Sequence, residues 1–380
     1  MRHATPSFTC IIISLLLSSA ACINISIASA PVVLWSAVDT LHKCGIIDVP
    51  DIPLRVFSPA AGDVRAVVGS TSYHRMNGSS IFSLSRECAA AWNETGDPDP
   101  SHFAGDEFLD STWWFPNNTV FSLIHTEYPG NVYKNCSGPS YPHCWTVTIG
   151  LGVSFDGGST WQHARPPPAH LVAAVPYGYN GSQLAAGWGD PSNIIFRAGY
   201  FYAAIWNRNV VGLQAPGVCI MRTADLSDPS SWRAWDGADY TVPFASPYTL
   251  PPGTEGRHVC TVTNLPLGCP VGGMAWSAAL QLYVASLDCS LQGGAHFYYA
   301  TSPDLIRWSA PATLYTHSDL PANASKVVTS MSYPTWVDPA GADPNYGTLS
   351  DEPWLSWVSI GHSPYSDGRK LWATQFRIQA

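Results

Sequence analysis

The sequence has few charged residues. Only 12% of its 380 residues are Asp, Glu, Lys or Arg, the formal net charge is −9, and no basic cluster occurs. Proteins that bind nucleic acid or an anionic membrane present a basic patch that neutralises phosphate charges. The composition therefore argues against both partners.

Several other signals are also missing. No long helical pattern is visible, no G-x-S-x-G follows a strand, and neither a Gly-rich phosphate loop nor a CxxC spacing is present. These absences argue against a serine-hydrolase elbow, a phosphate-binding loop and a zinc site. We expect no metal and no cofactor.

Turn-forming and aromatic residues are abundant instead. The chain contains 31 Gly, 32 Pro, 16 Trp and 17 Tyr. With so few charges, this composition is typical of short strands joined by many turns. The length allows one large domain or two ordinary ones, with a real hydrophobic core.

The N-terminus is typical of an export signal. Arg2 and His3 precede the apolar run CIIISLLLSSAAC, and small residues follow it. Cleavage after Ala21 or after Ala30 fits this pattern, and an alternative is a bacterial lipoprotein signal that acylates Cys22. The run is short for a membrane span, so we expect a secreted protein with no stable membrane span.

The remaining cysteines and the sequons agree with export. Eight cysteines lie beyond the signal, and an even number in an exported chain favours disulfides. Cys136 and Cys144 flank a Pro/Gly-rich hairpin tip and are the pair most strongly indicated. The other six allow fifteen pairings, of which adjacency suggests 44–88, 219–260 and 269–289. Acceptor sites for N-glycosylation stand at Asn77, Asn93, Asn117, Asn135, Asn180 and Asn323.

One turn recurs along the chain. SFDGGSTW (154–161) has counterparts in TSPDLIRW (301–308), in RTADLSDPSSW (222–232) and, without the Asp, in SLSRECAAAW (83–92). Their last tryptophans lie 69, 71 and 76 residues apart, and such a period indicates a repeated supersecondary unit. The Asp can accept backbone N–H bonds within its own hairpin while the Trp packs between sheets. We therefore interpret this turn as structural and not catalytic.

Each unit contains the same succession of strand-like runs. The inner runs are IPLRVF, FLDSTWWF, SNIIFR, GGMAWSA and YPTWVD, and the second runs are VRAVVGS, TVFSLIH, YFYAAIWN, LQLYVASL and PWLSWVSIG. Antiparallel hairpins at regular spacing predict blades around an axis. The sequence thus predicts an all-β fold, a five-bladed β-propeller of four-stranded antiparallel blades closed by VVLWSAV (32–38). The signal peptide would occupy 1–30 and a single propeller domain 31–380. A pair of two-sheet β-sandwiches is the structural alternative.

Two of the turns resemble those of known propellers. SFDGGSTW resembles the Asp-box turn, S-x-D-x-G-x-T-W, of sialidases and related proteins. TSPDLIRW is similar to the blade turn of five-bladed glycosidases, the arabinanase, xylosidase and invertase-like group. HTEY (125–128), PSNI (191–194) and RTADLSDPSSWRAWDG (222–237) resemble segments of uncharacterised secreted propeller proteins. The likeness to the uncharacterised proteins supplies no activity, but the likeness to the five-bladed glycosidases implies a glycoside hydrolase that acts on a glycan or polysaccharide.

The resemblance also implies catalytic carboxylates. In the five-bladed glycosidases three carboxylates reach the axial funnel from the starts of the inner strands of blades one to three. One activates water, one protonates the leaving oxygen, and one orients the acid. The matching positions are Asp51 as base, Asp106 or Glu107 as modulator or acid, and Asp190, where the family has Glu. Glu127 in HTEY is the substitute acid, and an ordinary turn or surface role is the alternative for each.

Other polar groups are candidates for contacts with sugar hydroxyls in the same funnel. These substrate-binding candidates are Arg55, His125, Asn193, Arg222, His258 and Tyr333. Four tryptophans that could offer faces for stacking are Trp113, Trp114, Trp188 and Trp336, although most of the 16 tryptophans must be core residues.

Three functions remain open from the sequence. The first is a secreted glycoside hydrolase, which we expect to be a monomer and whose partner is a carbohydrate. The second is a sialidase-like enzyme, which needs an arginine cluster for the substrate carboxylate and usually six blades; Arg55, Arg222 and Arg257 are the available trio. The third is a propeller that binds carbohydrate or protein without turnover, because fold alone does not decide function.

Overall fold

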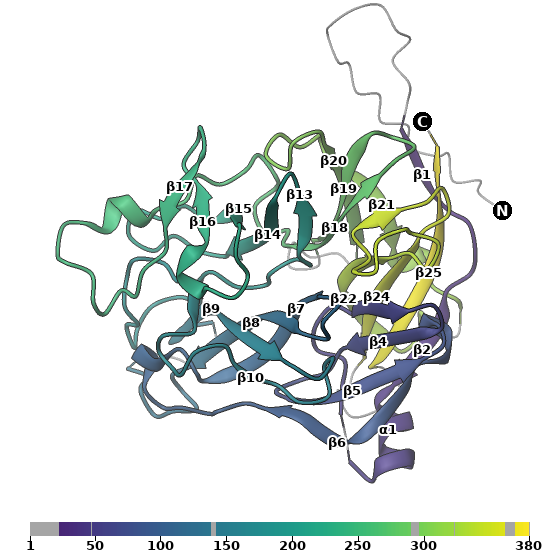
Figure 1. The fold of residues 1–380 in the computed structure, drawn as a ribbon, viewed down its shortest axis with the longest axis horizontal. Helices are drawn as coiled ribbons and strands as arrows, with labels where there is room; N and C mark the ends of the chain where they lie inside the picture. The colour runs from purple at the N-terminus through teal and green to yellow at the C-terminus, as the bar shows by residue number, and fades with distance from the viewer. Residues whose placement is uncertain are drawn as a thin grey trace, which may run out of the picture.

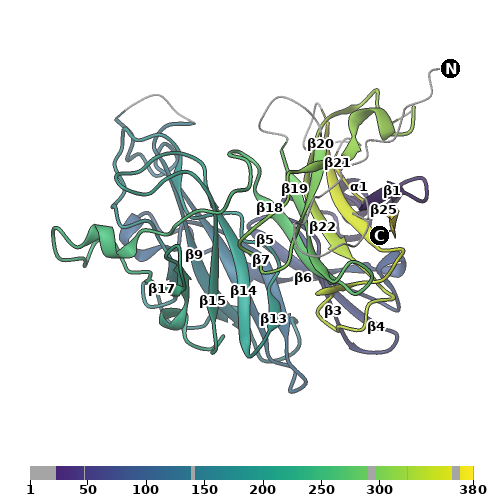
Figure 2. The same ribbon diagram turned by 90° about the horizontal axis from the view of Figure 1, so that it is seen from above.

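The computed structural model describes residues 23–46, 48–137, 142–289, 296–322, 324–361 and 369–379. Their strands form five sheets that succeed one another around a central axis (Figures 1 and 2). The predicted five-bladed β-propeller is therefore confirmed, and the β-sandwich alternative is wrong. None of the helices in the described ranges is long and apolar enough to cross a membrane.

Blades one and two follow each other along the lower part of Figure 1. Blade one runs outward as β3 (Arg55–Ala60), β4 (Asp63–Val67), β5 (Ser72–Gly78) and β6 (Ser85–Asn93), with η1 (Ile81–Ser83) before β6. After η2 (Pro100–His102), blade two has β7 (Asp106–Trp114), β8 (Val120–Pro129), β9 (Trp145–Ser154) and β10 (Gln162–His163), while β11 (Leu171–Ala173) and β12 (Ala186–Gly187) also pair with β9.

Blades three and four complete the far side of the ring. Blade three contains β13 (Ile195–Arg197), β14 (Tyr200–Asn207), β15 (Gly217–Thr223), β16 (Arg233–Trp235) and β17 (Tyr240–Pro243), with η3 (Pro229–Ser231) and η4 (Glu255–His258) in its loops. Blade four contains β18 (Val271–Ser277), β19 (Leu282–Asp288), β20 (His296–Ser302) and β21 (Ala312–Thr316), followed by η6 (His317–Asp319), and β23 (Thr348–Leu349) pairs in parallel with β18. Some blades thus exceed the predicted four strands.

Blade five joins the two ends of the described chain. It consists of β22 (Val328–Val337), β24 (Trp354–Gly361) and β25 (Lys370–Gln379), and β1 (Asn24–Ile27) and β2 (Val32–Ser36) both pair with β25. Figure 1 shows these first strands, in purple, beside the yellow β25. The predicted closing strand is confirmed, but it ends at Ser36 because this residue caps helix α1 (Ala37–Cys44) in a capping box with Asp39.

The hydrophobic core is divided among the interfaces between neighbouring blades. One cluster, for example, joins Phe57 and Tyr73 of blade one to Leu109 and Ile124 of blade two. Corresponding clusters lie between each other pair of adjacent blades. Each blade therefore buries both faces of its sheet against its neighbours, which is why its strands combine alternating and continuous apolar runs.

The recurrent turn connects a hairpin to these interfaces. Asp156 Oδ1 accepts the N–H groups of Ser159 and Thr160, each at 2.9 Å, so its carboxylate is used within the turn. Trp161 is buried in the cluster between blades one and two, and its Nε1 donates to the carbonyl of Gly158. Asp304 and Trp308 repeat the arrangement between blades three and four. The hydrogen bonds agree with the structural interpretation of this turn.

Four disulfides tie loops to the blades. Cys44 is bonded to Cys88, Cys136 to Cys144, Cys219 to Cys260 and Cys269 to Cys289. The pair at the hairpin tip and the three adjacent pairings are thus confirmed. Cys10 and Cys22 lie outside the described residues.

A single arginine at the axis forms hydrogen bonds with each of the other four blades. Arg55 of β3 donates from Nε to the carbonyl of Asp110 in blade two, at 2.6 Å, and from Nη2 to that of Pro191 at the start of blade three, at 2.9 Å. Its Nη1 donates to the carbonyl of Gly272 in blade four and to Thr335 Oγ1 in blade five, at 2.7 and 3.0 Å. The guanidinium is 2% exposed and lies 3.5 Å from the Asp110 carboxylate. These bonds hold the inner strands together at the centre of the ring.

Replacement of this arginine should destabilise the whole ring. Arg55→Met leaves the buried Asp110 carboxylate without its counter-charge, and loss of one partner of a buried pair costs about 3–5 kcal/mol. We expect a matching decrease in the free energy of unfolding in a urea titration. The control is Arg377→Met, which removes an exposed ion pair to Glu352 and should cost less than about 1 kcal/mol. Equal effects of the two variants would contradict the central role of Arg55.

Candidate active site

Three adjoining cavities lie at one end of the axis. Their volumes are about 150, 100 and 40 Å³, and Asp190 and Tyr333 line all of them. Both residues have left-handed backbone conformations, with φ angles of 45° and 63°. Non-glycine residues adopt this conformation at a cost and often do so at functional sites. The site is therefore built where the backbone is strained.

Carboxylates from four blades surround these cavities. Asp51 comes from blade one, Asp110 and Glu127 from blade two, Asp190 from blade three and Asp288 from blade four. Tyr333 of blade five completes the wall, and its N–H donates to Asp288 Oδ2 at 2.9 Å. The ring thus brings together acidic groups that are distant in the sequence.

Asp51 is held by two groups of blade five. Arg369, which precedes β25, forms an ion pair with its carboxylate, and the Tyr333 hydroxyl donates to Asp51 Oδ1 at 3.2 Å. Burial lowers the pKa of Arg369 to about 10, so the guanidinium remains charged at neutral pH. The Asp51 side chain is 32% exposed. A charged partner and access to the cavity are both available to this carboxylate.

His125 links two other carboxylates. Its Nε2 lies 3.2 Å from Glu127 Oε1, and its Nδ1 accepts the backbone N–H of Asp190 at 2.8 Å. Burial lowers the pKa of His125, but the hydrogen bond to Glu127 and the charges of Asp190, Glu127 and Asp110 raise it to about 9. A protonated Nδ1 could not accept the Asp190 N–H, so that bond opposes the rise. The imidazole therefore holds the Glu127 carboxylate on one side and the Asp190 backbone on the other, and its protonation state depends on the charges of both residues.

Two aspartates of the site have raised pKa values. Burial raises the pKa of Asp110 to about 7, against the charges of Arg55 and His125. Burial also raises the pKa of Asp190, and the charge of Glu127 adds to this, against His125 and Arg208. Asp190 still reaches solvent, with 37% of its side chain exposed, whereas Asp110 is 3% exposed. Of the two, Asp190 is the carboxyl that a ligand in the cavity can touch.

The largest cavity has an aromatic and cationic side. Trp145, Trp206 and Arg208 also line it, and the Arg208 guanidinium lies 5.2 Å from the centre of the Trp206 ring. Faces of tryptophan beside polar groups suit the apolar and hydroxylated faces of a sugar ring.

The structure brings some of the predicted residues together. Asp51, His125, Glu127, Asp190 and Tyr333 all line the cavities. Arg55 lies at the axis, where the protein itself uses its donors.

Other predicted residues lie elsewhere. Asp106 accepts the Tyr133 hydroxyl at 2.7 Å and lines none of the three cavities. Asn193 forms two hydrogen bonds with the backbone of Met274, which join blades three and four. Arg222 lies over the rings of Tyr200 and Tyr240.

His258 contacts the carbonyl of Pro243 in a loop of blade three. The four tryptophans suggested for stacking are buried and line none of these cavities: Trp113, Trp114, Trp188 and Trp336. The arginine trio of a sialidase-like site is not assembled, because Arg55 is at the axis, Arg222 is in β15 and Arg257 is in η4.

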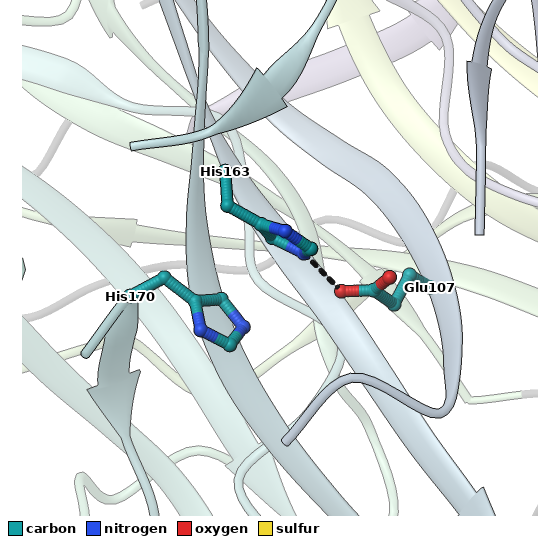
Figure 3. Close-up of side chains that lie close together, drawn as sticks. All are labelled: Glu107, His163 and His170. Atoms are coloured by element: carbon teal, nitrogen blue, oxygen red, sulfur yellow. Dashed lines mark hydrogen bonds and ion pairs between the residues drawn. The ribbon is translucent and has the colours of Figure 1, made fainter. Parts of the chain in front are cut away.

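Glu107 belongs to a separate cluster on the opposite side of β7. Glu107 is fully buried, as is His170, which precedes β11, and both lie close to His163 of β10, which is partly exposed (Figure 3). His163 Nε2 lies 2.6 Å from Glu107 Oε1, and the Thr95 N–H donates to Oε2 at 2.9 Å. Burial and the charge of His163 lower the pKa of His170 to about 4.

Sequence reasoning missed several residues of the site, and some had a visible signal. Asp110 interrupts the apolar run FLDSTWWF, and Asp288 ends the second strand of its blade, while Glu127 lies near the end of the second strand of blade two. Arg369, Arg208 and Trp206 carry no comparable pattern.

Comparisons with known proteins support the fold. No protein-family model matches the sequence, and no curated protein does. Among solved structures, the chain is similar to a putative glycoside hydrolase from Bacteroides ovatus, with a TM-score of 0.50, 9% identity and 86% of each chain covered. It is also similar to an alpha-L-arabinofuranosidase from Podospora anserina in complex with cellotriose (TM-score 0.49, 9% identity, 86% of this chain and 90% of that chain). A third is an exo-beta-1,3-galactanase from Phanerochaete chrysosporium (TM-score 0.49, 11% identity, 93% and 64%).

The chain is thus a five-bladed β-propeller, and its fold is similar to that of a putative glycoside hydrolase. The predicted resemblance to five-bladed glycosidases is confirmed for the fold, which is all that identities this low show.

Proposed function

We propose that this protein is an exported glycoside hydrolase and that the axial cavities bind the sugar at the scissile bond. The observation that carries the proposal is the convergence of Asp51, Glu127 and Asp190 on adjoining cavities, in unequal electrostatic environments. Hydrolysis of a glycoside needs one carboxylate that is ionised and one carboxyl that is protonated at the same pH.

The environments suggest how the roles are divided. Asp51 faces the positive charge of Arg369, which suits a base that takes a proton from the attacking water. Asp190 has a raised pKa and reaches solvent, which suits the acid that protonates the leaving oxygen. His125 would hold Glu127 and the Asp190 backbone in place. One water is consumed, and its hydrogens end on the new sugar hydroxyl and on the leaving group.

Removal of either carboxyl should abolish most of the turnover. We expect Asp51→Asn and Asp190→Asn to lower kcat by ~10²–10⁴-fold, the usual contribution of a general acid or base. The assay screens the protein on aryl glycosides and on plant and algal polysaccharides. Asp239→Asn is the matched control, because Asp239 also pairs with an arginine, Arg222, but is 65% exposed and lines none of the three cavities.

The possible outcomes separate this proposal from the binding function. Full activity in both cavity variants would contradict the assignment of the site. If the wild-type protein binds sugars on a glycan array but hydrolyses none of the substrates, the propeller is a carbohydrate-binding protein instead.

The pH dependence should report the acid. A raised pKa in the folded protein means that Asp190 stays protonated to higher pH, and activity should be lost as the pH rises through that pKa. For Asp190→Asn we expect this alkaline decrease in kcat/KM to disappear, with a smaller loss on glycosides that have a good leaving group. An unchanged alkaline limb in the variant would assign the acid to another residue, with Glu127→Gln as the next test.

Export itself is also a proposal. It rests on the N-terminal sequence pattern, on the four disulfides and on exposed sequons at Asn93, Asn117, Asn135 and Asn180. Asn323 lies outside the described residues.

Cleavage of the signal after Ala21 fits the fold better than cleavage after Ala30. Strand β1 pairs with β25 through four residues, and Ile23 and Ile25 are buried between blades four and five. Cleavage after Ala30 would remove all of these contacts. We expect the mature protein to begin at Cys22, as measured by mass spectrometry of its N-terminal peptide. The same spectrum would reveal an acyl group on Cys22, and a mature N-terminus at Pro31 would contradict this proposal.

A further inference from the structure

Three possible metal ligands meet between blades one and two. Glu107 of β7, His163 of β10 and His170 each place one donor atom within 4.8 Å of the other two (Figure 3). Two imidazoles and one carboxylate form a ligand set that zinc and other divalent transition metals use in proteins. These residues belong to neither the axial cavities nor the proposed reaction.

The surroundings hold each donor in place. The Thr95 N–H fixes one carboxylate oxygen of Glu107, and the other faces His163. The Trp92 ring contacts His163 edge-on, with 5.1 Å between ring centres. A Cβ at Gly150 would lie 2.7 Å from His170 Cδ2, so the glycine makes room for this ring. Ligands fixed by their neighbours are the mark of a preorganised site.

Hydrogen bonding within the protein leaves part of this cluster unexplained. The contact between Glu107 and His163 accounts for those two residues, but His170 bonds to neither. Its Nε2 lies 3.1 Å from the Phe103 carbonyl, and its fully buried Nδ1 has no hydrogen-bond partner among the described residues. By contrast, both ring nitrogens of His125 in the axial site are engaged. One ring nitrogen of His170, Nδ1, is thus not used by any described residue. Its Nε2 is the nitrogen drawn toward Glu107 in Figure 3, and a metal ion held by this nitrogen would replace its contact with the Phe103 carbonyl.

We propose that Glu107, His163 and His170 bind a divalent transition metal ion, with Zn²⁺ as the best fit. The ion would fasten β10 and the segment before β11 to the inner strand β7, next to the contact with blade one. Glu107 and His170 are 0% exposed, while the His163 side chain is 14% exposed and offers the route of entry. The role of the metal ion would be to stabilise the fold.

The test uses the full-length secreted protein without an affinity tag, treated with a chelator and dialysed. Titration with ZnCl₂ alone, followed by calorimetry, should show one equivalent bound per chain and an increase in Tm. We expect His163→Gln and His170→Gln each to weaken binding by at least about tenfold, since even outer-shell changes cost 10–100-fold. His102→Gln is the control, because His102 is 45% exposed beside Asp97 and Asp99 and should not change zinc binding.

Two results would overturn the proposal. One is the absence of heat and of any Tm shift in the wild-type protein with excess zinc. The other is binding that both cluster variants retain unchanged, which would place the ion elsewhere. If the variants fail to fold, the visible spectrum of the wild-type protein with Co²⁺ decides: bands of nitrogen and oxygen coordination support the site, and their absence refutes it. None of these readouts depends on glycoside hydrolysis.

Discussion

The whole ring depends on how Arg55 satisfies its donors at the axis. Five sheets that meet at a centre leave carbonyl groups of the inner strands pointing inward, and buried carbonyls without partners are costly. A planar guanidinium has five donors in a fixed arrangement, and here it bonds to residues of blades two, three, four and five from its own place in blade one. The apolar clusters between blades supply most of the buried area, but they act pairwise. Arg55 is the group that joins all five blades at one point.

The same constraint places the candidate active site. The Asp110 carboxylate forms an ion pair with Arg55. Asp110 lies at a bulge of β7, between Leu109 and Ser111, and this bulge directs its carboxyl group toward the axis. Directly beyond it lie Asp190 and Tyr333, both in left-handed conformations. Arg55 itself is buried and lines none of the three cavities. The residues with strained backbones, the carboxylates and the three cavities therefore all lie at the same end of the ring.

The sequence predicted the features that depend on local chemistry. Alternating apolar runs, turn residues and the spacing of the tryptophans after each turn are short-range patterns, and they were sufficient for the blades and for closure by the N-terminal strand. Asp51 and Asp190 were expected from the resemblance to five-bladed glycosidases, which have carboxylates at the starts of the inner strands, and both line the cavities. The same resemblance pointed to Asp106 or Glu107 in β7, but it is Asp110 that lines the cavities. Counting along the strand cannot identify the residue that faces the axis, because consecutive strand residues face opposite sides and a bulge changes the count.

Residues that depend on the closed ring escaped prediction. Arg369 stands more than three hundred positions from Asp51 in the chain, and they meet only when β25 lies beside blade one. His163 and His170 come close to Glu107 only because both follow β9 back across blade two. The tryptophans suggested for stacking were assigned by residue type alone, and the packing between blades uses them instead.

The central claim is that the axial cavities are where the protein acts on a sugar. The most direct measurement is a crystal structure of Asp51→Asn with an oligosaccharide that the wild-type protein hydrolyses. We expect an ordered sugar ring among Glu127, Asp190 and Tyr333, with its glycosidic oxygen within hydrogen-bonding distance of the Asp190 carboxyl. An ordered sugar at another face of the propeller, with only water between these residues, would contradict it.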